Sequence, residues 1–194
     1  MGRRYQAVSR YLGIDCSGCD ISSSRVERIP PKDALVLIAT PTEHHLNDCF
    51  SYLASGEHDV LCEKPIVKTR DDLEKLKGIN LDRLFMVNNY CYTEESGIYP
   101  YPGITSYNYY MSGKDGLIWD CIQLFGLAKS RIELQNTSPI WTCIINGVSI
   151  ERNSIDKSYI EMITDFFHRK EHLWSGQKII EIHEKVLKYI ENQK

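Results

Sequence analysis

Apolar runs alternate with amphipathic helical segments along the first 90 residues of the chain. The run at residues 34–39, Ala-Leu-Val-Leu-Ile-Ala, has the composition of a strand that is buried on both faces. Shorter runs at 59–62 and 83–88 follow it, each separated from the previous one by a segment with helical periodicity. Parallel strands require crossover connections of this kind, so the alternation predicts a parallel sheet built from βαβ units.

Helix caps and chain breakers divide the rest of this half. Residues 3–12 place Tyr5, Val8 and Leu12 on one helical face, and Gly13 is a helix stop. We also expect a strand at 14–20, a short helix at 22–29 that ends at Pro30-Pro31, a helix at 42–54 with Gly56 as its C-cap, and a helix that Thr69 caps.

The pattern changes beyond residue 96. Residues 103–111 alternate like a strand with two unlike faces, and 117–128 have the pattern of a buried helix. The remaining segments predict antiparallel strands at 131–134 and 140–151, the second turning at Asn146-Gly147, and helices at 155–168 and 175–193. A Tyr/Pro/Gly-rich stretch at 97–103 separates the two patterns. We therefore expect an α/β domain with a parallel sheet at 1–96 and a small α+β domain with a mostly antiparallel sheet at 97–194.

Composition excludes several classes of protein. The formal net charge of −3 gives no basic stripe, so we expect no nucleic-acid partner. No apolar run approaches the ~18 residues of a membrane helix, so we expect no membrane association. The seven cysteines are odd in number and mostly lie in apolar segments, which favours a reduced, cytoplasmic setting over a disulfide framework. Cys16 and Cys19 have CxxC spacing but no second ligand pair, so we expect no metal there.

Two motifs follow the predicted strands at their carboxyl ends. Thr40-Pro41-Thr42 follows the run at 34–39, with His45 four residues after the proline, and Glu63-Lys64-Pro65 follows the run at 59–62. The carboxyl ends of neighbouring parallel strands form the crevice in which α/β proteins bind ligands. Taken alone, the local sequence predicts that His45 lies on a helix surface and that Glu63 and Lys64 form an exposed charge pair.

The order of these motifs resembles the Gfo/Idh/MocA family of nicotinamide-dependent oxidoreductases, which act mainly on sugars, sugar nucleotides and polyols. The resemblance is strongest from residue 33 to residue 72 and implies a Rossmann-like domain that binds NAD. It implies that Lys64 approaches the substrate and the nicotinamide. The residues that it places at the cofactor are Thr40, Pro41, Thr42, His45, Glu63 and Lys64.

The resemblance also extends to the start of the chain. Gly2, followed by Arg3, resembles the last glycine of GxGxxG, and Asp20 stands about where an acid binds the ribose and favours NAD over NADP. The alternative for Asp20 is a helix cap or a turn. The first strand and most of the glycine motif are missing, and on this numbering 34–39 and 59–62 are strands three and four. Three explanations stay open: a start upstream, a sheet that closes differently, or a partner that fills the slot.

In the second domain the family usually supplies an Asp followed four residues later by a His. Here Asp120 is followed by Gln123 and Leu124, and glutamine cannot take a proton from a hydroxyl. Asp120 reads equally well as a buried helix residue. It stays open whether Lys64, Asp120 or a tyrosine replaces the histidine. Tyr92, which follows the strand at 83–88, and Gln123 are candidate substrate contacts.

The resemblance implies hydride transfer between NAD(H) and a sugar, sugar nucleotide or polyol-type substrate, with Lys64 and Asp120 as catalytic residues. The tyrosine-rich second sheet predicts a homo-oligomer. One alternative is a catalytically impaired or non-catalytic cofactor-binding or assembly module derived from this fold. Another is an oligomerisation protein with no affinity for a cofactor.

Overall fold

The structure is a computed structural model that describes residues 1–18, 30–93, 105–109, 113–129 and 131–193. Cys19, Asp20, the helix expected at 22–29 and the domain boundary expected at 97–103 lie outside the described residues.

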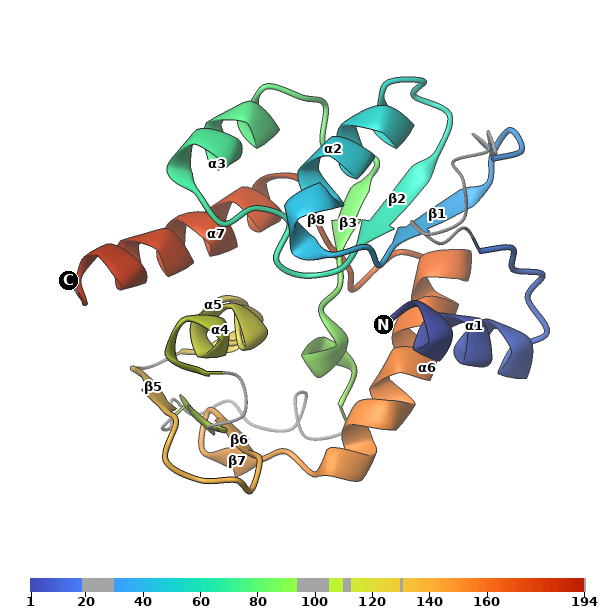
Figure 1. Cartoon of the computed structure of the whole chain (residues 1–194). Helices are drawn as coiled ribbons and strands as arrows, with labels where there is room; N and C mark the ends of the chain where they lie inside the picture. Colours follow the sequence, from blue (N-terminus) through green and yellow to red (C-terminus); the bar gives the residue numbers. More distant parts are fainter. Residues whose placement is uncertain (19–29, 94–104, 110–112, 130, 194) are drawn as a thin grey trace.

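The first sheet contains three parallel strands, as the sequence predicts. β1 (Leu35–Ile38), β2 (Asp59–Cys62) and β3 (Leu84–Met86) are neighbours in that order, and β8 (Trp174–Ser175) pairs antiparallel with β3 (Figure 1). The numbering of β1 and β2 as strands three and four is wrong. In the order 3-2-1-4-5-6 strands three and four are not adjacent, whereas β1 and β2 pair directly.

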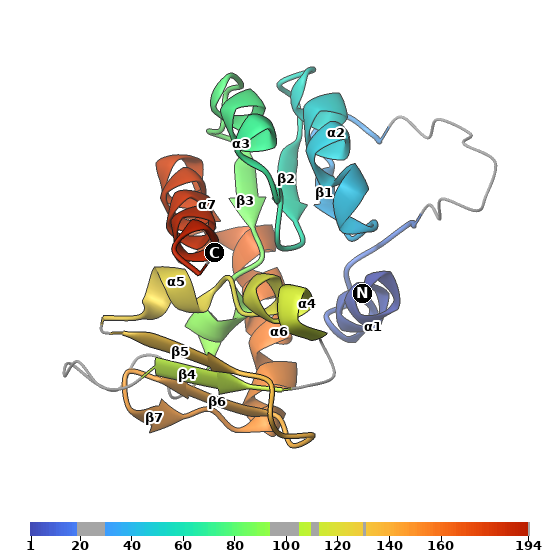
Figure 2. The same ribbon diagram turned by 60° about the vertical axis from the view of Figure 1, so that its left-hand side comes forward.

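Helices cover both faces of this sheet. α2 (Thr42–Leu53), α3 (Arg70–Lys77) and α7 (Gly176–Glu191) pack on the face that carries Val60 and Cys62. α1 (Gly2–Tyr11) and α6 (Arg152–His168) pack on the opposite face, which carries Leu61. Successive residues of a strand point to opposite faces, so the continuous apolar runs fill both cores. The ribbon in Figure 2 shows how these helices lie around the sheet.

The strand expected at 14–20 is wrong over residues 14–18, which form neither strand nor helix. The backbone N–H of Ile14 donates to Ser9 O and that of Gly13 donates to Arg10 O, with Gly13 at a φ of +69°. This is the Schellman closure of α1, and it uses the N–H groups with which a strand would have begun.

The second sheet has the order β5-β4-β6-β7. Its strands are β4 (Thr105–Asn108), β5 (Ile132–Gln135), β6 (Thr142–Ile145) and β7 (Val148–Ser149). The turn at Asn146-Gly147 is confirmed, with φ values of +51° and +86°. The antiparallel orientation expected for β5 is wrong, because β5 runs parallel to β4. α4 (Gly113–Asp120) and α5 (Leu124–Leu127) lie between these strands in the chain and form the crossover that a parallel pair requires.

The expected helix at 117–128 is therefore interrupted, since residues 121–123 form a turn between α4 and α5. The short helix η1 (Asn89–Tyr92) follows the first sheet, and α6, β8 and α7 return to it. The division into domains at residues 96 and 97 stays a prediction. None of the helices in the described ranges combines the length and apolar character needed to cross a membrane.

The contact between α5 and the first sheet can be tested at Gly126. A Cβ atom there would lie 2.5 Å from Cη2 of Trp174 and 2.8 Å from Cδ1 of Ile182. We expect Gly126→Ala to lower the free energy of unfolding by about 1–3 kcal/mol, although alanine favours helices, because both neighbours are packed in the core. Thermal unfolding measures the change. Gly2→Ala is the control, since its Cβ would have no neighbour within 4 Å. Equal stability of the two variants would contradict this packing.

Candidate functional site

A cleft of about 520 Å³ opens at the carboxyl ends of β1 and β2. Its walls come from α1, from the loops that follow β1 and β2, from the end of α4 and from α6. The lining residues are Met1, Arg4, Ala39, Thr40, Pro41, Thr42, His45, Glu63, Lys64, Asp120 and Tyr159.

Most residues of the two sequence motifs meet in this cleft. Thr40, Pro41, Thr42, His45, Glu63, Lys64 and Asp120 all line it. Gly2 and Arg3 lie in the first turn of α1, between two residues that line the cleft. Tyr92 and Gln123 are not among the lining residues.

Lys64 extends from the end of β2 to the end of α4. Its Nζ donates a hydrogen bond to the backbone carbonyl of Asp120 at 2.8 Å. A cation at the C-terminal end of a helix is favoured by the helix dipole. An ammonium carries three N–H groups, and in the part of the chain that the structure describes this carbonyl is the one acceptor bonded to Lys64 Nζ. Asp120 contributes its backbone to this bond and also lines the cleft.

Glu63 is buried and is held by α1. The hydroxyl of Tyr5 donates to Glu63 Oε1 at 2.5 Å, and the backbone N–H of Lys64 donates to Oε2 at 3.1 Å. Tyr5 and Glu63 are only 3% and 5% exposed. Burial, followed by the charge of Glu63, raises the pKa of Tyr5 well above its usual value, so Tyr5 stays a donor. This bond fixes α1 to the end of β2.

His45 joins the loops that follow β1 and β2. Its Nδ1 lies 2.7 Å from the carbonyl oxygen of Pro65, and its Nε2 lies 2.8 Å from that of Thr40. Both partners are carbonyl oxygens, so the ring lies between two acceptors. The side chain is 2% exposed, which indicates that His45 shapes the cleft rather than offering a ring nitrogen to it.

His183 of α7 contacts the same loop from the other side. The backbone N–H of Ile66 donates to His183 Nε2 at 3.2 Å, and His183 Nδ1 lies 2.8 Å from Ile179 O. Since Nε2 accepts, Nδ1 carries the proton and donates to the carbonyl. Burial lowers the pKa of His183 to about 4, which keeps the ring neutral at pH 7.

Gln123 belongs to a buried polar network. Its Oε1 accepts from Tyr90 N–H at 3.0 Å and its Nε2 donates to Asn89 Oδ1 at 2.9 Å. Asn89 in turn donates to Ser158 Oγ at 3.2 Å. The amide of Gln123 therefore links the turn between α4 and α5 to η1 and α6.

Tyr92 is also bonded within the protein. Its hydroxyl donates to Asp165 Oδ2 at 2.6 Å, and the backbone N–H groups of Glu171 and His172 donate to the same carboxylate. The binding roles predicted for Tyr92 and Gln123 stay predictions, but the hydroxyl and the amide that would serve them are bonded elsewhere.

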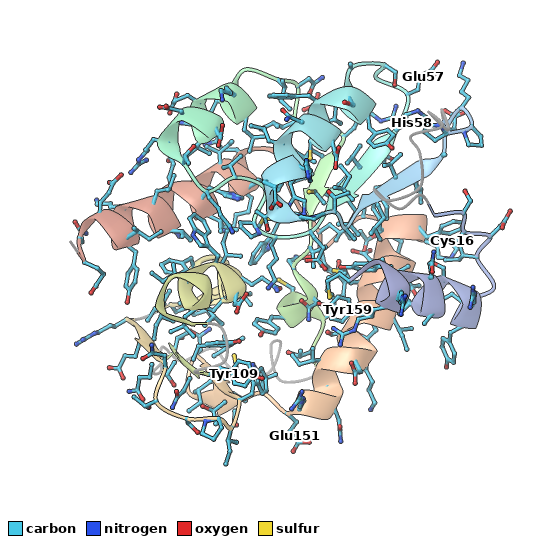
Figure 3. The ribbon with its side chains drawn as sticks, viewed as in Figure 1. Cys16, Glu57, His58, Tyr109, Glu151 and Tyr159 are labelled. Atoms are coloured by element: carbon cyan, nitrogen blue, oxygen red, sulfur yellow. The ribbon has the colours of Figure 1, made fainter. Side chains whose placement is uncertain are left out.

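The sequence did not indicate Arg4 and Tyr159 as site residues. The Arg4 guanidinium lies 4.8 Å from the centre of the Tyr159 ring and 3.7 Å from Asp156. The ring of Tyr5 meets that of Tyr159 edge to face at 5.7 Å, beside α1 in Figure 3. Arg4 is thus a second cation in the cleft, held on an aromatic face. The helical periodicity of both segments indicated core packing alone.

Among the described residues, no group of three or more His, Cys, Asp and Glu side chains is arranged to hold a metal ion. Cys16 is exposed, and its CxxC partner lies outside the described residues.

Among the comparisons with known proteins, the comparison with solved structures bears on the fold. No protein-family model matches the sequence, and no curated protein matches it. A similar solved structure is the crystal structure of the WlbA (WbpB) dehydrogenase from Thermus thermophilus in complex with NAD and UDP-GlcNAcA. The TM-score is 0.51 at 13% sequence identity, over 78% of this chain and 70% of that chain. At this identity the likeness confirms the α/β, Rossmann-type fold alone.

The bond between Tyr5 and Glu63 predicts a loss of stability on deletion of one hydroxyl. Tyr5→Phe leaves a buried carboxylate without one of its donors, so we expect the free energy of unfolding to fall by about 1–3 kcal/mol. Urea unfolding measures this. Tyr11→Phe is the matched control, because Tyr11 lies on the same helix and is 76% exposed. Equal effects of the two substitutions would contradict the bond.

The buried His183 predicts a specific pH dependence. Its pKa of about 4 in the folded chain lies below the ordinary 6.5, so its contribution is complete above about pH 6.5 and is lost as the pH falls toward 4. Glutamine does not titrate. The stability advantage of the native chain over His183→Gln should therefore shrink by roughly 3 kcal/mol between pH 7 and pH 4. Urea unfolding at both pH values measures it, and a constant difference would argue against a neutral buried ring.

Proposed function

We propose that this chain is a Gfo/Idh/MocA-like oxidoreductase that transfers hydride between NAD(H) and a sugar, sugar nucleotide or polyol-type substrate. The observation that carries the proposal is the meeting of both sequence motifs and Asp120 in one cleft at the carboxyl ends of β1 and β2. Segments 24 and 56 residues apart in the chain, counted from Thr40 to Lys64 and from Lys64 to Asp120, converge there. The similar structure, solved with NAD and a nucleotide sugar, supports the same assignment.

The cleft suits a dinucleotide in position and size. It lies at the edge where Rossmann-type sheets bind such ligands, and its volume falls within the ~300–1,000 Å³ of small-molecule sites. The N-terminal turn of α1, with Gly2 and Arg3, offers backbone N–H groups and a helix dipole to phosphates. Thr40, Pro41 and Thr42 would form the wall beside the nicotinamide ribose. Asp20 would bind the other ribose and favour NAD.

Lys64 and Asp120 are the residues that we assign to the reaction. NAD, when bound, supplies the hydride acceptor. The Lys64 ammonium, whose one hydrogen-bond partner among the described residues is the Asp120 carbonyl, would hold a substrate hydroxyl and stabilise the negative charge that develops on its oxygen. Asp120 lines the same cleft, and its carboxylate is our candidate acceptor for the hydroxyl proton.

A second candidate function is a non-catalytic cofactor-binding or assembly module. The buried network of Gln123 favours it, because the amide at that position serves the fold and cannot act as a base. This candidate shares the NAD site with the first and differs in turnover. A homo-oligomer through the second sheet is compatible with both.

The first experiment is a titration of the purified chain with NADH and NADPH, followed by nicotinamide fluorescence. Saturable binding that prefers NADH supports a cofactor site, and turnover of a panel of UDP-sugars and polyols separates the two candidates. We expect Lys64→Ala to lower turnover by about two to three orders of magnitude. Lys68→Ala is the control, since Lys68 is exposed and lies outside the cleft. Binding without turnover would favour the second candidate, and no binding would overturn both.

A further inference from the structure

The loop that follows β2 is fixed from both sides by histidines of different helices. The carbonyl of Pro65 lies 2.7 Å from His45 Nδ1, on the side of α2. The N–H of the same peptide group is bound by α7, where the N–H of Ile66 lies 3.2 Å and that of Val67, in the next peptide group, 3.5 Å from His183 Nε2.

His183 of α7 supplies a hydrogen-bond acceptor at a buried place that water does not reach. Ile66 and Val67 are 1% and 3% exposed, and His183 is fully buried. Without an acceptor the buried N–H of Ile66 would be unpaired, which proteins avoid because such a group is costly. The acceptor stands 117 residues away along the chain.

The tautomer of His183 allows Nε2 to accept the hydrogen bond from Ile66. Nε2 can accept only because the ring is neutral with its proton on Nδ1, and the carbonyl of Ile179 holds that proton at 2.8 Å. Burial keeps the pKa of His183 low, at about 4, so the acceptor persists at neutral pH. The ring has no access to the cleft or to solvent.

We propose that His183 is a positioning residue for Lys64. His183 holds the loop after β2 by accepting a hydrogen bond from the backbone N–H of Ile66. Lys64 and Ile66 lie on either side of Pro65. A loop released at Ile66 therefore lets the Lys64 ammonium leave the carbonyl of Asp120. The inference rests on the proposed function only because that function gives Lys64 a ligand to bind. The hydrogen bond between Ile66 and His183 forms in the protein without any ligand.

Three variants of α7 test this role in the full chain. His183→Leu removes the acceptor, whereas His183→Gln keeps an oxygen of similar reach. Val186→Ala is the matched control, because Val186 is fully buried on the same helix and contributes no polar atom. All three variants are compared under conditions in which they have equal thermal stability. A loss of packing of α7 then affects the three variants equally.

The primary readout is amide hydrogen exchange at Ile66 and Val67, measured by NMR without any ligand. We expect exchange at these two amides to rise about ten- to a hundredfold in His183→Leu over Val186→Ala, and His183→Gln to restore most of the protection. Equal exchange in His183→Leu and Val186→Ala would overturn the proposal. So would a failure of His183→Gln to restore protection while it remains folded.

The second readout is NADH affinity and turnover, which separates this inference from the proposed function. If the native chain binds NADH, His183→Leu should weaken binding or turnover about tenfold or more, with partial rescue by His183→Gln. Raised exchange with unchanged binding and turnover would overturn the positioning role. If the native chain does not bind NADH, the proposed function fails, and the exchange experiment still decides whether His183 holds the loop.

Discussion

The structure depends on how the segment from Glu63 to Val67 is held. Four consecutive residues each bond to a different helix: Glu63 to Tyr5 of α1, Lys64 to Asp120 of α4, Pro65 to His45 of α2, and Ile66 to His183 of α7. A segment that leaves a parallel sheet loses its ladder partners, and the polar groups of this one are buried where water cannot replace them. The bonds of these four residues therefore also place the helices around the end of the sheet. Removing His183 leaves the buried N–H of Ile66 unpaired, so the position of this short loop depends on a helix that lies far away along the chain.

Residue type and local order predicted the site only where it lies close to a strand. The apolar runs of β1 and β2 fix the ends of those strands, and with them the motifs at Thr40 and Lys64, because parallel strands deliver their carboxyl ends to one edge. Neither motif required knowledge of a distant contact. Arg4, Tyr159 and His183 were missed because they come from helices whose periodicity indicates core. Their roles arise from contacts 117 to 155 residues apart along the chain, counted from Ile66 to His183 and from Arg4 to Tyr159. The parallel pairing of β5 was missed for a related reason: it depends on the crossover by α4 and α5, which strand composition does not encode.

Two residues with reactive side chains illustrate how a fold uses polar groups for itself. Tyr92 and Gln123 have types and positions that suggested contact with a substrate, yet the hydroxyl binds Asp165 and the amide binds Tyr90 and Asn89. Each satisfies groups that would otherwise be buried without a partner. Sequence alone could not distinguish the two uses, because both need the same donors and acceptors. The distinction has a consequence for the proposed reaction: because these two groups are bonded within the protein, the proposal assigns the chemistry to Lys64 and Asp120, which line the cleft.

The interpretation of Glu63-Lys64 as an exposed charge pair is wrong. Glu63 is 5% exposed and bonds to Tyr5, and Lys64 reaches across the cleft to a backbone carbonyl instead of to its neighbour. From Glu63 to Val67, Lys64 alone is not buried. The buried residues on both sides thus hold the backbone. The one side chain that they present carries a positive charge, and its hydrogen-bond partner among the described residues is the carbonyl of Asp120. An ammonium held in this way loses little conformational entropy when it meets a ligand, because its backbone is already ordered. Preorganisation of this kind is what a lysine in a binding site requires, and it supports the role that we propose for Lys64.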